Sequence, residues 1–179
     1  RLILGSRVEE FENAFSSYCS VDYGVGVNSG TDALFLALKA LGIGGGDEVI
    51  TVSNTAVPTV AAICAAGAVP VFIDVEEDTF LMDTSKIEAA VTSRTKCIMP
   101  VHLFGQPVEM EPLLEIAQQR NLKIVEDCAQ AAGALYKGQK VGSFGEIGAF
   151  SFYPTKVLGA YGDGGMAVTS DKNLYEKLR

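Results

Sequence analysis

Residues 148–165 read GAFSFYPTKVLGAYGDGG. The first part, with Phe150 and Phe152, predicts a buried strand, and Pro154 ends it because proline cannot donate to a sheet ladder. Proline also disfavours helix at the residue before it, so Lys156 is expected on a loop just past the strand end. The glycines that follow permit positive φ angles and close approach of the backbone. Most lysines are solvated surface residues, but a desolvated one can form a Schiff base with a carbonyl cofactor. This stretch alone leaves both interpretations open.

A second stretch, LKIVEDCAQAAGA at residues 122–134, places polar groups after a strand. Leu122–Val125 predicts a short buried strand, with Glu126 and Asp127 at its C-terminal end. Ligands of parallel α/β sheets bind at this end of the strands. A carboxylate there could equally cap a following helix. Gln130 follows three residues later.

A third stretch, VGVNSGTDALFLALKAL at residues 25–41, reads as a strand, a turn and an amphipathic helix. The turn, residues 28–31, includes Gly30 and Thr31. Unpaired N–H groups and the helix dipole make such a turn a phosphate site. Many strand–turn–helix junctions look alike, so this stretch alone does not identify one.

Together the three stretches supply what pyridoxal phosphate needs: a phosphate cradle, a carboxylate for the pyridine nitrogen and a lysine. In detail the sequence resembles the DegT/DnrJ/EryC1/StrS family of aminotransferases, which belongs to fold type I of the pyridoxal-phosphate enzymes. The resembling motifs are SGTDAL (29–34), GDEVIT (46–51), PVHLFGQP (100–107), EDCAQAAGA (126–134) and FSFYPTKVLGAYGDGG (150–165). They occur in order across essentially the whole chain.

The alternation of short apolar runs with helical patterns predicts an α/β fold. We expect three αβα layers around a mostly parallel sheet covered on both faces. The expected strands are 23–27, 48–52, 69–73, 96–101, 122–125 and 165–169. The expected helices are 6–18, 31–41, 58–66, 84–91 and 110–120, with a hairpin or loop at 133–144. In the first helix, core packing is expected for Val8, Phe11, Phe15 and Tyr18.

The resemblance implies roles for individual residues. Lys156 would attach the cofactor and carry a proton during the reaction. Asp127 would pair with the pyridinium nitrogen, and Gln130 would hydrogen-bond the ring's phenolic oxygen. The phosphate would be bound by Gly30, Thr31 and Ser151. Without the resemblance, Asp127 reads as a cap, Gln130 as a surface amide and Ser151 as a strand hydroxyl.

The sequence departs from the family pattern at Ala56, where many members carry an aromatic residue stacked on the cofactor ring. His102, at another expected strand end, is a candidate substitute for that contact. A lone histidine is more often a hydrogen-bonded structural residue, so both interpretations stand.

Composition limits the partners. The 179 residues carry 14 basic and 22 acidic side chains, a formal net charge of −8, which argues against nucleic acid or an anionic membrane. No apolar run approaches the roughly 20 residues of a membrane span. The widely spaced Cys19, Cys64, Cys97 and Cys128, with a single histidine, argue against zinc and predict reduced core thiols in a cytoplasmic protein.

The resemblance also implies an activity: transfer of an amino group from L-glutamate to a keto group of a nucleotide-linked sugar, in a homodimer. The motifs do not separate C3 from C4 of the sugar, although NTAVPTVAAI (54–63) favours a 3-keto-6-deoxyhexose. The alternatives are a sugar dehydratase, against which Lys156 argues, an aromatic amino acid synthase, or a non-catalytic regulatory or scaffold protein. We expect residues 1–179 to be an incomplete pyridoxal-phosphate-binding large domain that lacks a smaller C-terminal domain. Alone, it should be inactive and prone to association.

Overall fold

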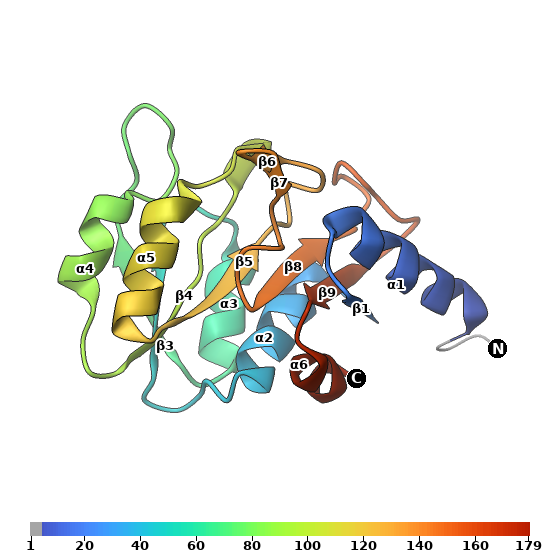
Figure 1. Cartoon of the computed structure of the whole chain (residues 1–179), viewed down its shortest axis with the longest axis horizontal. Coiled ribbons are helices and arrows are strands. Elements are labelled where there is room, and N and C mark those ends of the chain that lie inside the picture. The colour runs from blue at the N-terminus through green and yellow to red at the C-terminus, as the bar shows by residue number, and fades with distance from the viewer. Residues whose placement is uncertain (1–4) are drawn as a thin grey trace.

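Seven strands form the central sheet in the computed structural model, which describes residues 5–179 (Figure 1). Residues 1–4, part of the expected domain, lie outside the described residues. The strands are β1 (Tyr23–Val27), β2 (Glu48–Val52), β3 (Val69–Ile73), β4 (Thr95–Ile98), β5 (Lys123–Asp127), β8 (Ile147–Ser151) and β9 (Gly165–Thr169). Their order in the sheet is β1-β9-β8-β5-β4-β2-β3. β9 runs antiparallel to both of its neighbours, and the other neighbouring pairs are parallel.

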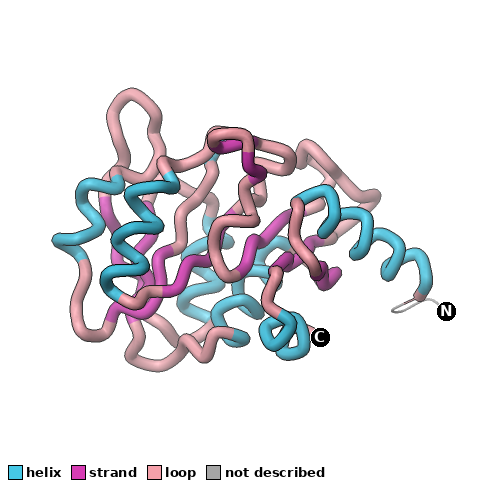
Figure 2. Tube along the Cα trace, viewed as in Figure 1, coloured by secondary structure: helices cyan, strands magenta, loops and turns pink. Residues whose placement is uncertain are grey.

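Helices cover both faces of this sheet (Figure 2). They are α1 (Ser6–Cys19), α2 (Gly30–Ala40), α3 (Val57–Ala65), α4 (Ile87–Ala90), α5 (Met110–Arg120) and α6 (Lys172–Leu178), with short 3₁₀ turns η1 (Thr84–Lys86) and η2 (Leu103–Gly105). A hairpin of two short strands, β6 (Leu135–Tyr136) and β7 (Gln139–Lys140), lies within the hairpin or loop expected at 133–144.

The layers follow from the two-residue period of the strands. In β2, Val49 belongs to the core formed with α2, α3 and α6, whereas its neighbour Ile50 belongs to the core formed with α4 and α5. In β8, Ala149 faces the first core, while Phe150 packs with Phe15 of α1 in a third cluster. The expected α/β fold with three layers and a mostly parallel sheet is therefore confirmed.

The packing expected for α1 is confirmed for Phe15 and wrong for the other three residues. Of the four apolar residues, Phe15 is buried, but Val8, Phe11 and Tyr18 are 37%, 40% and 48% exposed. The buried stripe instead consists of Glu12, Phe15, Ser16 and Cys19. The carboxylate of Glu12 accepts the Gly26 N–H at 2.8 Å and pairs with the Arg179 guanidinium at 2.7 Å. The buried face of α1 therefore includes a charged residue, Glu12, and differs from the face that the apolar pattern predicted.

The cysteines divide differently from the expectation. Cys19, Cys97 and Cys128 are buried free thiols, but Cys64 is exposed on α3, so it is not a core thiol. Burial raises the pKa of the Cys19 thiol to about 12. Within residues 5–179, none of the helices has the length and apolar character that a membrane crossing requires.

One edge of the sheet collects the ends of several strands. β5 ends at Asp127, and the last residue of β8, Ser151, pairs with the first residue of β9, Gly165. Gly165 also pairs with Val27, the last residue of β1. Segments that are distant in sequence therefore meet at this edge.

Candidate functional site

A cavity of about 290 Å³ opens at this edge of the sheet. The residues predicted from the sequence that line it are Gly30, Thr31, Asp127, Gln130, Ser151 and Lys156. They come from the start of α2, from the end of β5 and the turn after it, and from the end of β8 and the loop after it. The structure thus brings the three sequence stretches to one place.

The turn between β1 and α2 forms one wall. Ser29 caps α2: its hydroxyl accepts the Asp32 N–H at 3.1 Å, and its carbonyl accepts the Ala33 N–H. The N–H groups of Gly30 and Thr31 lie in the first turn of α2, where a helix offers no backbone acceptor for them. Among the described residues, no group accepts a hydrogen bond from either of them. These two N–H groups and the helix dipole can hold an anion.

Close packing explains the glycine at position 30. A Cβ on Gly30 would lie 2.7 Å from the Cβ of Ser151, so no larger residue fits between α2 and β8. Across the same turn, a Cβ on Gly165 would lie 2.3 Å from the carbonyl carbon of Ser29. The turn is therefore packed closely against β8 and β9, and Gly30 and Thr31 line the cavity together with Ser151.

The lysine loop follows β8 as the proline predicts. The N–H of Tyr153 donates to Ser151 Oγ at 3.3 Å, which leaves the hydroxyl proton of Ser151 free to donate elsewhere. The N–H of Lys156 donates to the Tyr153 carbonyl at 2.8 Å and closes a turn over Pro154. The half-buried side chain of Lys156 lines the cavity.

Asp127 is the last residue of β5 and is almost completely buried. Its Oδ2 accepts the Thr59 hydroxyl at 2.8 Å, and its Oδ1 accepts the Ala129 N–H at 3.1 Å. Burial raises the pKa of Asp127, although these two hydrogen bonds oppose the rise. Residues 128–134 form turns and not a helix, so the capping role that the sequence left open is not realised.

Gln130 is oriented by the loop after β4. Its Oε1 accepts the N–H of Phe104 at 3.0 Å. A backbone N–H can only donate, so the oxygen of this amide is fixed and its NH₂ group must point away from Phe104. Phe104 itself is in a left-handed conformation (φ 58°), followed by Gly105 at φ 82°. The strained turn and the cavity-lining amide thus hold each other in place.

His102 does not line the cavity, so of its two interpretations the structure supports the hydrogen-bonded structural one and not the contact with the cofactor ring. The side chain is fully buried, with Nε2 3.1 Å from Glu126 Oε2, and Nδ1 accepts the Val108 N–H at 3.1 Å. Because Nδ1 accepts, the ring is neutral and Nε2 carries the proton. Its role is structural. Ala56, where many family members carry the aromatic residue, does line the cavity.

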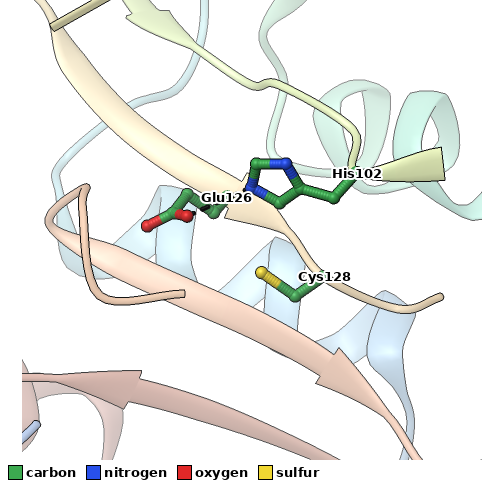
Figure 3. A group of neighbouring side chains, drawn as sticks. All are labelled: His102, Glu126 and Cys128. Carbon is green, nitrogen blue, oxygen red and sulfur yellow. Dashed lines mark hydrogen bonds and ion pairs between the residues drawn. The ribbon is translucent and has the colours of Figure 1, made fainter. Parts of the chain in front are cut away.

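Figure 3 shows His102 directed at Glu126, with Cys128 beside them. Ligand atoms of these three residues lie within 4.8 Å of one another. However, both ring nitrogens of His102 are engaged, and Glu126 also accepts N–H groups from the loop after β7. Burial raises the pKa of the Cys128 thiol far above its usual range. The trio is a packed hydrogen-bonded cluster that a metal ion would have to disrupt.

Several lining residues were not predicted from the sequence, among them Thr55, Thr59 and Asp163. Thr59 lies in the first turn of α3, directly after Pro58, and a helix that follows a parallel strand starts at the ligand-binding edge. That rule could have pointed to Thr59. Asp163 precedes β9. Its place at this edge could be predicted only by knowing that β9 runs antiparallel to its neighbours, so that the start of β9 lies where the other strands end.

The fold and cavity place the chain among the aminotransferases. A crystal structure of S. venezuelae DesV in complex with a ketimine intermediate superposes with a TM-score of 0.96 at 51% identity, over 98% of this chain and 47% of that one. A profile of the DegT/DnrJ/EryC1/StrS aminotransferase family matches residues 1–179, and the chain belongs to this family.

Two curated relatives extend the comparison. The dTDP-3-amino-3,4,6-trideoxy-alpha-D-glucose transaminase of Micromonospora megalomicea subsp. nigra is 57% identical over 99% of this chain and 48% of its own length. The UDP-N-acetyl-3-dehydro-alpha-D-glucosamine 3-aminotransferase of Acidithiobacillus ferrooxidans is 52% identical over 99% of this chain and 48% of its own length. The chain spans about half the length of these relatives.

Proposed function

We propose that the protein carrying this chain is a pyridoxal-phosphate-dependent aminotransferase. It would move an amino group, from L-glutamate, to a keto group of a nucleotide-linked deoxysugar. The observation that carries the proposal is the convergence of Lys156, Asp127 and the Gly30–Thr31 turn on one cavity. Residues 1–179 would be the incomplete cofactor-binding large domain, with a smaller domain beyond it.

The residues present fit the cofactor. Gly30, Thr31 and Ser151 offer two N–H groups and a hydroxyl proton for the phosphate. Asp127 retains an acceptor position on each oxygen beyond its two hydrogen bonds, which suits the ring N–H. The NH₂ group of Gln130, turned away from Phe104, suits the phenolic oxygen.

Bound pyridoxal phosphate would supply the electron sink and the carrier of the amino group. The protein residues would do the rest. Asp127 would hold the proton on the ring nitrogen. Lys156 would hold the cofactor until the amino donor arrives, and its Nζ would then accept and return the proton at the reacting carbon. The cavity walls would orient the two substrates in turn.

The sugars in the names of these two relatives carry an amino or a keto group at C3, which supports a sugar substrate aminated at C3, as the segment 54–63 also suggested. The family resemblance leads us to expect a cytoplasmic homodimer whose second subunit completes the site. Exposed apolar side chains on α1 and on the lysine loop support this expectation, among them Phe11, Tyr18, Tyr153, Val157 and Leu158. For the same reason we expect residues 1–179 alone to be inactive and to associate.

The test is amino transfer by the complete protein that carries this chain. Purified protein is incubated with pyridoxal phosphate, L-glutamate and dTDP-linked 3-keto or 4-keto 6-deoxyhexoses, and products are identified by mass spectrometry. We expect 2-oxoglutarate and a 3-amino sugar, both lost in Lys156→Ala. Deoxygenated sugar without amination would favour a dehydratase. Cofactor binding without turnover of these sugars would favour a regulatory role or an aromatic amino acid synthase, which acts on none of them.

A further inference from the structure

Two threonine hydroxyls extend from Asp127 along the cavity wall. Thr59 Oγ1 lies 2.8 Å from Asp127 Oδ2, and Thr55 Oγ1 lies 2.7 Å from Thr59 Oγ1. All three residues line the cavity. Thr59 is almost completely buried, and a buried hydroxyl keeps its hydrogen bonds because water cannot replace them.

The direction of the hydrogen bonds from Thr55 through Thr59 to Asp127 follows from counting protons. An ionised carboxylate can only accept, so the single hydroxyl proton of Thr59 goes to Asp127. The Thr59 oxygen must then accept from Thr55, which makes Thr55 the donor at the outer end. Each hydroxyl is thereby oriented by the next.

The hydrogen bonds to Asp127 determine how its carboxylate is oriented toward a ligand in the cavity. Thr59 occupies one acceptor position of Oδ2 and the Ala129 N–H occupies one of Oδ1, so both oxygens are fixed in place. The charged groups around Asp127 do not replace Thr59. Lys156 faces it from the cavity, Glu126 is taken up by other N–H donors, and His102 is neutral. The Thr59 bond also opposes the rise in the pKa of Asp127 that burial causes.

We propose that Thr59, oriented by Thr55, is a positioning residue that holds the Asp127 carboxylate aimed at the ring nitrogen of the cofactor. This inference rests on the proposed function. It assigns a role in cofactor recognition to the first turn of α3. This role concerns binding of the cofactor, before the sugar substrate is bound. Thr59 acts through Asp127 and is not itself required to touch the reacting atoms.

The experiment measures cofactor binding and not turnover. Wild type, Thr59→Val, Thr59→Ser and Thr51→Val are made in the complete protein that carries this chain. Thr51 is a matched control, because it is a buried threonine whose hydroxyl donates to the Met99 carbonyl at 2.9 Å, outside the cavity lining. Dissociation constants are measured for pyridoxamine phosphate and for its 1-deaza analogue, in which CH replaces the ring nitrogen.

Thr59→Val should weaken binding of pyridoxamine phosphate about tenfold, the usual effect of losing a hydrogen bond to a charged group. It should leave binding of the deaza analogue within about twofold, since that ligand has no ring nitrogen for Asp127. Thr59→Ser and Thr51→Val should resemble wild type with both ligands.

Equal weakening of both ligands by Thr59→Val would mean a general packing role and would overturn the inference, as would no change with either ligand. Wild-type protein that binds neither ligand would instead overturn the proposed function, and the inference with it. The two failures are therefore distinguishable.

Discussion

Replacing Glu126 by glutamine tests how the strand that carries Asp127 is held. Glu126 is fully buried, and each carboxylate oxygen accepts two N–H groups. The donors are Gly142 (2.7 Å) and His102 (3.1 Å) at Oε2, and Phe144 (2.8 Å) and Gly145 (2.8 Å) at Oε1. These bonds join β5 to the loop after the hairpin.

Glutamine cannot reproduce this arrangement. Its NH₂ group must replace one of the two oxygens, and at either place it would face two N–H donors. His102 cannot adapt by changing tautomer, because a proton on Nδ1 would then face the Val108 N–H. Two hydrogen bonds to a charged acceptor are lost, each worth about 1.5–3 kcal/mol, so Glu126→Gln should cost at least about 3 kcal/mol.

The assay is urea unfolding of the cofactor-free complete protein, followed by circular dichroism. Glu88→Gln is the matched control, since Glu88 forms an exposed pair with Arg120 and its replacement should cost less than about 1 kcal/mol. If Glu126→Gln were as stable as Glu88→Gln, the reasoning about the buried carboxylate would be refuted.

Two further predictions concern the cavity walls. Gly30→Ala should weaken pyridoxamine phosphate binding by at least about tenfold, because the new Cβ would lie 2.7 Å from that of Ser151. Gly45→Ala, which meets nothing within 4 Å, should bind normally, and equal affinities in the two variants would contradict the account. Burial raises the pKa of Asp127 above its ordinary 3.8. The folded protein therefore loses stability as the pH rises through the folded-state pKa, because Asp127 ionises less readily in the folded than in the unfolded state. Asp127→Asn should therefore stabilise the cofactor-free protein more at pH about 7 than at about 3.5 in thermal unfolding, and a pH-independent difference would contradict this sign.

Much of the fold could be predicted because most strands of the central sheet are short apolar runs with turn signals at their ends. The position of Lys156 followed from Pro154 for the same kind of local reason. The buried face of α1 could not be predicted, because Glu12 is stabilised there by Gly26 and by Arg179, the last residue of the chain. Local pattern carries no information about such a distant partner.

The candidate site shows the same limit. Asp127 and the turn at Gly30 were found because both follow strands, and parallel strands end at one edge. His102 follows a strand too, but its ring turns into the core to meet Glu126. The end of a strand predicts the edge at which a residue lies and not the direction of its side chain. Thr59 was missed for the complementary reason, since it starts a helix and does not end a strand.

Attachment of the cofactor to a single lysine is the direct test of this cavity as a pyridoxal phosphate site. The complete protein is mixed with pyridoxal phosphate, reduced with borohydride to make any lysine–cofactor link permanent, digested and mapped by mass spectrometry. We predict a single labelled peptide with the cofactor on Lys156, and none in Lys156→Ala. No label, or label spread over exposed lysines such as Lys137 and Lys96, would contradict the assignment of this cavity as a pyridoxal phosphate site.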